Sequence, residues 1–143
     1  CHDLLKGEDS LKAYKNFYER QNNIGFSPKM KGLGPAFYTK LIYFLGDQTG
    51  LIMDQWTAKS VNKLCGYKCV KLENNKTVSK KNDVNVYKQY LYIVSEIQKT
   101  LKLETLSNAE ELIFSCSHKH PSVKKLLGHH HEVCSAWRKY VAE

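Results

Sequence analysis

Residues 31–59 read KGLGPAFYTKLIYFLGDQTGLIMDQWTAK, and this stretch contains two signals for the start of a helix. The first is a Gly-Leu-Gly turn followed by Pro35, because proline fits the first position of a helix, where its missing N–H costs nothing. The second is Asp54, whose carboxylate can accept hydrogen bonds from the first amides of a helix. We therefore predict one helix over residues 35–45 and another that follows Asp54 and ends at Gly66.

The rest of the chain also has helical periodicity. Apolar residues recur at three- and four-residue spacing over residues 8–21, with Asp9 or Ser10 as the cap, and over residues 83–103. Residues 107–110 read as a capping box before a buried run, and Pro121 opens a last helical region that reaches Val141. Residues 71–81 are lysine-rich without periodicity, so we expect an exposed loop there. The prediction is an all-α single domain over residues 1–143, with six to seven helices.

Length and composition are those of a folded domain. The 143 residues are 42% hydrophobic and 25% charged, which argues against a disordered chain. The longest apolar run covers residues 41–45, whereas a bilayer span needs about 20 residues, so we expect no membrane association. Because the sequence begins at Cys1 rather than at Met, the domain can lack an N-terminal segment.

The charge favours a polyanionic partner. The chain carries 22 basic and 14 acidic residues, a net charge of +8, and residues 55–81 contain seven lysines but one glutamate. Only Arg20 and Arg138 are arginines, so phosphate attraction is favoured over the reading of base edges. A solvated loop flank is the alternative interpretation of the lysine cluster.

The five cysteines are widely spaced and odd in number, which is typical of a reducing compartment, so we expect a cytoplasmic protein. Cys65 and Cys69 could form half of a zinc site, but their spacing matches no tight template. We therefore expect no metal and no cofactor. The remote candidates for the other half of a zinc site are His118, His120, His129, His130, His131 and Cys134.

The glycine turn before Pro35 predicts contact with a nucleic-acid backbone. Two glycines allow another backbone to approach closely, and the first amides of the following helix favour a phosphate. Such a turn is the hairpin of a helix-hairpin-helix, which holds DNA without reading its sequence. The backbone-binding residues that we expect are Lys31, Gly32, Leu33 and Gly34.

Lys40 and Asp54 are the candidate catalytic residues. The helix that carries Lys40 is apolar nearly all round, so we expect it to be buried, and burial favours the neutral, nucleophilic amine. A carboxylate fixed at a helix start suits a positive charge that develops on a sugar. The alternatives are a lysine that covers apolar surface and reaches water, and an aspartate that only caps its helix.

Over residues 31–59 the sequence resembles the helix-hairpin-helix DNA glycosylases, most closely the small prokaryotic 8-oxoguanine DNA glycosylase-like proteins of the OGG fold. In that family a Gly-apolar-Gly hairpin precedes a helix with the catalytic lysine, and an aspartate caps the next helix. Better-known eukaryotic-type members carry the lysine two residues after the second glycine, where this chain has Ala36. Ala36 and Lys40 are four residues apart and share a helix face. The resemblance places the hairpin and catalytic core in residues 28–65.

The resemblance implies a DNA glycosylase with associated AP-lyase activity that acts on double-stranded DNA containing a damaged base. It implies removal of an oxidised purine of the 8-oxoguanine type through a Schiff base on Lys40, without metal, in a nucleoid-associated cytoplasmic protein. Trp56 and Trp137 are candidates for stacking on the extruded base, with a core position as the alternative. A non-catalytic helix-hairpin-helix DNA-binding module of a repair or genome-defence assembly remains open, as does a helical interaction domain. The sequence identifies no partner subunits.

Overall fold

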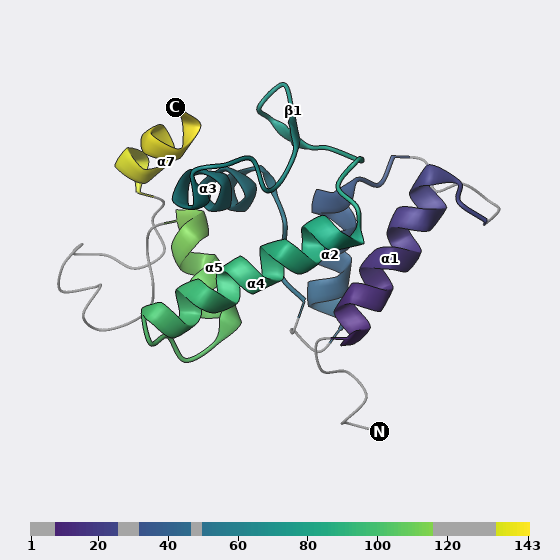
Figure 1. The fold of residues 1–143 in the computed structure, drawn as a ribbon, viewed down its shortest axis with the longest axis horizontal. Coiled ribbons are helices and arrows are strands. Elements are labelled where there is room, and N and C mark those ends of the chain that lie inside the picture. Colours follow the sequence, from purple (N-terminus) through teal and green to yellow (C-terminus); the bar gives the residue numbers. More distant parts are fainter. Residues whose placement is uncertain (1–7, 26–31, 47–49, 116–133) are drawn as a thin grey trace.

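The computed structural model describes residues 8–25, 32–46, 50–115 and 134–143, and these are mostly helical (Figure 1). The prediction of an all-α fold is confirmed, since the described ranges contain six helices and only a two-stranded sheet. None of these helices has the length and apolar character of a membrane span. The elements are α1 Glu8–Asn22, α2 Pro35–Leu45, α3 Gln55–Cys65, β1 Leu72–Glu73, β2 Thr77–Val78, α4 Val84–Thr100, α5 Leu106–Ser115 and α7 Ser135–Ala142.

The helices form two groups that α4 connects. Helices α1 and α2 lie side by side at one end of the molecule, and α3, α5 and α7 lie together at the other end (Figure 1). Helix α4 runs between the groups and packs against α1 on one side and α5 on the other. The candidate catalytic residues come from α2 and the start of α3, so the site depends on how these groups meet.

Buried tyrosines form the centre of the core. Tyr14 of α1 stacks on Tyr87 of α4 with 4.2 Å between ring centroids, and it meets the edge of Tyr38 of α2 at 4.9 Å. Buried hydroxyls need partners, and the Tyr14 hydroxyl donates to the backbone oxygen of Asn82 at 2.8 Å. Three helices are therefore joined by rings and by hydrogen bonds.

The predicted limits of the central helices are confirmed. Helix α2 begins at Pro35 and ends at Leu45, and Asp54 is the N-cap of α3. Gly66 ends α3 with φ of 72°, a left-handed conformation that suits glycine. Asp83 caps α4 by accepting hydrogen bonds from two backbone amides.

Two predicted caps are wrong. Asp9 and Ser10 lie inside α1, which spans Glu8–Asn22. The start of α5 is capped by Thr105 and Asn108, each of which accepts a hydrogen bond through its side chain from the other's backbone N–H at 3.1 Å. The threonine two residues before the predicted box makes this reciprocal pair, so the box at residues 107–110 does not form. Glu110 is thereby free to serve another role.

Residues 71–81 are a β-hairpin rather than only an exposed loop. Strand β1 pairs with β2 in antiparallel register, with Leu72 opposite Val78, and the turn contains two asparagines with positive φ. Val78 is buried, and the Asn82 side chain bonds both the backbone N–H and the backbone oxygen of Lys71 at 2.9 Å. These anchors order a segment whose strands are too short for a visible period of two.

Helix α2 is buried on one face only, which corrects the expectation of burial all round. Pro35, Tyr38, Thr39 and Ile42 are buried, but Phe44 is 71% exposed and Lys40 is also exposed. Helix α1 packs on one side of α2, whereas Phe37, Lys40 and Phe44 lie on exposed sides of this helix. The region predicted to be helical from Pro121 lies mostly in residues 116–133, outside the described residues, and α7 forms its end.

Candidate active site

Lys40 and Asp54 line one pocket of about 440 Å³. Lys40 comes from the exposed face of α2, and Asp54 stands half-buried at the start of α3. Helix α5 supplies the third wall. The other lining residues are Tyr43, Ile52, Thr57, Ser107, Glu110, Glu111 and Phe114. The structure thus brings an amine and a carboxylate together at one cavity, although fourteen residues separate them in the chain.

The Asp54 carboxylate is held by the amides of α3. Its Oδ1 accepts hydrogen bonds from the backbone N–H groups of Trp56 at 2.7 Å and Thr57 at 3.0 Å. The Thr57 hydroxyl accepts from the Asp54 N–H at 3.0 Å, which completes a capping box. Within the described residues, the hydrogen bonds to this carboxylate use Oδ1.

A second set of bonds fixes the extended segment before Asp54. The Tyr87 hydroxyl donates to the Leu51 oxygen and accepts from its N–H, both at 2.9 Å. The Thr39 hydroxyl accepts from the Met53 N–H at 3.1 Å. Leu51 and Met53 are fully buried. Because α2 and α4 both hold this segment, the position of Asp54 relative to Lys40 is set by the core.

Glu110 is a buried carboxyl in the wall of the same pocket. Its side chain is only 7% exposed, and burial, with a smaller effect of the Asp54 charge, raises the pKa of Glu110 to about 8. At neutral pH the group is therefore mostly protonated. The Tyr90 oxygen lies 3.0 Å from Glu110 Oε1 and 3.1 Å from the Ile52 oxygen. A single hydroxyl hydrogen serves one acceptor at a time, so the Tyr90 hydroxyl donates either to the Glu110 carboxyl or to the Ile52 oxygen.

Sequence reasoning missed the α5 wall, although a signal was present. Ser107, Glu110, Glu111 and Phe114 line the pocket, and their spacing of three, four and seven residues places them on one helix face. That helix face is mostly polar. The interpretation of residues 107–110 as a capping box did not reveal that this face lines a pocket. A polar helix face that ends in an aromatic residue indicates a site wall when the facing helix carries reactive groups.

The glycine turn is open toward solvent. Gly32 has φ of 86°, and Gly34 is the N-cap of α2 with no side-chain cap. Among the described residues, no heavy atom outside the immediate neighbours lies within 4 Å of a Cβ built on either glycine. The Gln21 side-chain amide donates to the Leu33 oxygen and ties the turn to α1. Lys31, the fourth predicted backbone contact, lies outside the described residues.

With the pocket and the turn described, comparison with known proteins gives the family. The sequence model described as "Putative 8-oxoguanine DNA glycosylase OGG-like protein" matches residues 2–114, well over half of the chain. The chain belongs to this OGG-like family. No curated protein and no solved structure matches it. The membership confirms the resemblance noted in the hairpin segment, and it supports a function related to DNA glycosylases, with DNA as the partner.

The match includes every residue that lines the Lys40 pocket in this OGG-like protein, because these residues run from Lys40 to Phe114. Helix α7 lies beyond the matched residues. Helix α7 nevertheless packs against α3, which lies within the matched residues (Figure 1). The family match therefore covers the residues that line the pocket but not the residues of α7 that lie beside it.

The two tryptophans lie at different places. Trp56 does not line the Lys40 pocket, and its ring is covered by the Arg138 guanidinium, whose carbon is 4.1 Å from the ring centroid. The same guanidinium carbon is 4.4 Å from the ring centroid of Phe114, which does line the pocket. Trp56 is thus next to the pocket across Arg138, and its stacking role remains a prediction.

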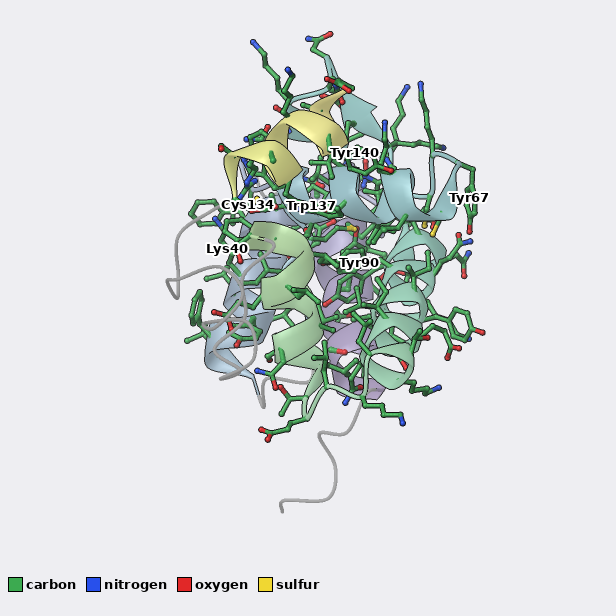
Figure 2. The ribbon with its side chains drawn as sticks, turned by 90° about the vertical axis from the view of Figure 1, so that its left-hand side faces the viewer. Lys40, Tyr67, Tyr90, Cys134, Trp137 and Tyr140 are labelled. Carbon is green, nitrogen blue, oxygen red and sulfur yellow. The ribbon has the colours of Figure 1, made fainter. Side chains whose placement is uncertain are left out.

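Trp137 lies on the side of α7 that faces α3 and α5 (Figure 2). Its indole N–H donates to the Ile113 oxygen at 2.8 Å, and the residue lines a separate, mostly apolar pocket. The structure does not bring Trp137 to Lys40 and Asp54. The aromatic residues that line the Lys40 pocket are Tyr43 and Phe114.

The cysteines in the described ranges are free thiols. Burial, with a smaller effect of Cys65, raises the pKa of Cys69 to about 11, so this thiol is protonated at neutral pH. The described residues contain no group of three or more metal-ligating side chains. The candidate histidines lie outside the described residues. The pair Cys65 and Cys69 is therefore not arranged as a metal site on its own.

Proposed function

We propose that the protein is a DNA glycosylase with associated AP-lyase activity that removes an oxidised purine of the 8-oxoguanine type. The observation that supports this most is the shared pocket of Lys40 and Asp54 in a member of the OGG-like family. The volume of about 440 Å³ lies in the usual range of small-ligand pockets and can receive an extruded base.

In the proposed reaction the neutral amine of Lys40 attacks C1′ of the extruded nucleotide. The N–C1′ bond forms as the bond from C1′ to the base breaks, and the base leaves with the electron pair and takes up a proton. Positive charge builds on the sugar ring in the transition state, and the fixed Asp54 carboxylate stabilises it. The C1′–O4′ bond then breaks, O4′ takes up a proton, and a protonated Schiff base on Lys40 remains. A base such as water removes a C2′ proton, the C3′–O bond breaks, and the 3′-phosphate leaves with the electron pair.

Lys40 stands on an exposed side of α2 and lines the pocket, so its surroundings depend on what fills the pocket. A nucleotide that fills the pocket expels the water and disfavours the charged ammonium. We therefore propose that the substrate, rather than the folded core, completes the desolvation of the nucleophile.

Glu110 has a separate proposed role in this pocket. Its carboxyl is mostly protonated at neutral pH and lines the α5 wall. A protonated carboxyl can donate a hydrogen bond to an acceptor atom of the extruded purine. The open amides of the glycine turn would hold a phosphate of the same DNA.

The test is base release from duplexes that each contain one lesion, measured for wild type, Lys40→Gln and Asp54→Asn. Lys88→Gln is the matched control, because Lys88 is exposed and lines neither the Lys40 pocket nor the Trp137 pocket. We expect wild type and Lys88→Gln to release 8-oxoguanine and Lys40→Gln to release none. If wild type binds these duplexes and releases no base, the non-catalytic DNA-binding module is the better interpretation.

A further inference from the structure

Besides the Lys40 pocket and the Trp137 pocket, a pocket of about 590 Å³ lies between α3, the β-hairpin segment and α7. We call it the α3–α7 groove. Lys59, Lys63 and Lys68 line it together with Tyr67, and the acidic lining residue is Glu143. The groove therefore carries a positive charge excess on a surface that the Lys40 pocket does not use.

Lys59 is an unusual lysine because it is only 9% exposed. Its ammonium lies 4.6 Å from the Trp56 ring centroid. The ion pairs in the described ranges are Lys15 with Glu19 and Lys99 with Glu96, so neither Lys59 nor Lys63 has a carboxylate within 4.0 Å there. An ammonium that lines a groove without an acidic partner attracts an anion.

Arg138 of α7 is the second cation on Trp56. Its guanidinium lies over Trp56 and over Phe114, and its Nη1 is buried with no hydrogen-bond partner among the described residues. Partial burial lowers the pKa of Arg138, and the charge of Asp54 opposes this effect. The guanidinium stays charged at neutral pH, so its surroundings favour an anionic partner.

These contacts join the α3–α7 groove to the Lys40 pocket. Lys59 lines the groove and contacts Trp56, Trp56 contacts Arg138, and Arg138 contacts Phe114 of the pocket. Lys63 adds another cation–ring contact beside the groove, because its ammonium lies 4.7 Å from the Tyr140 ring centroid. Figure 2 shows Lys40 and Tyr67 on opposite sides of the view, with Tyr140 of α7 between them.

We propose that Arg138 and the lysines of the α3–α7 groove bind the phosphates of the DNA strand that carries the extruded nucleotide. Cations interleaved with aromatic rings are typical of surfaces that follow a single nucleic-acid strand. The guanidinium fork matches a phosphate, and the lysines continue the contact away from the pocket. This inference rests on the proposed function for the position of the nucleotide, and it assigns a role to α7, which lies outside the family match.

The experiment measures binding to a duplex with a stable tetrahydrofuran abasic analogue, which cannot be excised, at several salt concentrations. Each phosphate contact contributes about 0.9 to the slope of log affinity against log salt. We expect Lys63→Gln and Arg138→Gln each to reduce the slope by about 0.9 and to weaken binding several-fold. Arg138→Lys and the distant control Lys88→Gln should keep the slope.

Strand assignment uses a neutral methylphosphonate next to the analogue, on one strand at a time. Neutralisation on the analogue strand should weaken wild type several-fold and Arg138→Gln hardly at all. An effect confined to the opposite strand, or an unchanged slope in folded Lys63→Gln and Arg138→Gln, would overturn the inference. If these results hold but no lesion is released by wild type, the inference stands and the proposed enzymatic function fails.

Discussion

The hydroxyl of Thr39 accepts a hydrogen bond from the backbone N–H of Met53 at 3.1 Å. Each of these residues precedes a candidate catalytic residue, so this one bond connects the backbone beside Lys40 to the backbone beside Asp54. The same hydroxyl donates to the Pro35 oxygen at 2.7 Å, and both Thr39 and Met53 are fully buried. The bond therefore sets the distance between α2 and the start of α3 inside the core.

Thr39→Val should weaken both the fold and the site. The valine leaves the buried Met53 N–H without a partner, which costs about 1–3 kcal/mol of unfolding free energy. Urea unfolding gives the stability, and base release at a temperature where both proteins are folded gives the activity. Thr39→Ser keeps the hydroxyl and should retain more activity than Thr39→Val. Equal activity of the two variants would show that this bond does not position the catalytic pair.

Asp54→Asn should separate capping from chemistry. Asparagine caps helices about as well as aspartate, so stability should change little, whereas Asp54→Ala should lose about 0.5–2 kcal/mol. The neutral amide cannot stabilise a positive sugar, and we expect base release to fall by about 10²–10³-fold. Thermal melts and single-turnover rates measure the two effects. Full activity of Asp54→Asn would leave Asp54 with capping as its only role.

Glu110 should make stability depend on pH. Its pKa is about 8 in the folded protein and 4.5 ordinarily, so between these pH values the native state keeps a proton that the unfolded state has released. The free energy of unfolding should therefore fall as pH rises from 4.5 to 8, by up to about 1.4 kcal/mol per pH unit. Glu110→Gln should remove this contribution. Urea titrations at four pH values measure it, and identical slopes in both proteins would contradict the assignment.

Gly34→Ala should reduce DNA binding with only a small change in stability, because alanine is a poorer N-cap than glycine but also lowers the entropy of the unfolded chain. The glycine has φ of −96°, which alanine adopts readily, and no heavy atom of the described residues outside its chain neighbours lies within 4 Å of an added Cβ. The methyl group would stand where we expect a phosphate to approach, so affinity for undamaged duplex should fall several-fold. Gly34→Ala with both wild-type stability and wild-type affinity would exclude this turn as a backbone contact.

Local signals in the sequence were enough for the helix limits of the central segment. Pro35, the Asp54 cap and the Gly66 stop each act through their own backbone neighbours, so no tertiary information was needed. The helix context and the family resemblance both selected Lys40 and Asp54, and the structure places these two residues at one pocket. The catalytic roles themselves remain predictions.

The features that the sequence did not reveal depend on tertiary packing. An apolar helix such as α2 gives no indication of which side its neighbours cover, and Phe37, Lys40 and Phe44 proved to be exposed. The protonated state of Glu110 follows from burial by α4 and the segment before Asp54, not from its own neighbours in the chain. Arg138 was visible only as a charge, because its contacts with Trp56 and Phe114 join helices far apart in sequence.

The most direct test of the central claim is to trap the covalent intermediate with borohydride and to map the modified peptide. Wild-type protein is incubated with a duplex containing 8-oxoguanine, reduced, digested and analysed by mass spectrometry. The account predicts one DNA adduct on Lys40, absent from Lys40→Gln and present in Lys88→Gln. An adduct on another amine that persists in Lys40→Gln, or no adduct with any lesion duplex that wild type binds, would contradict it.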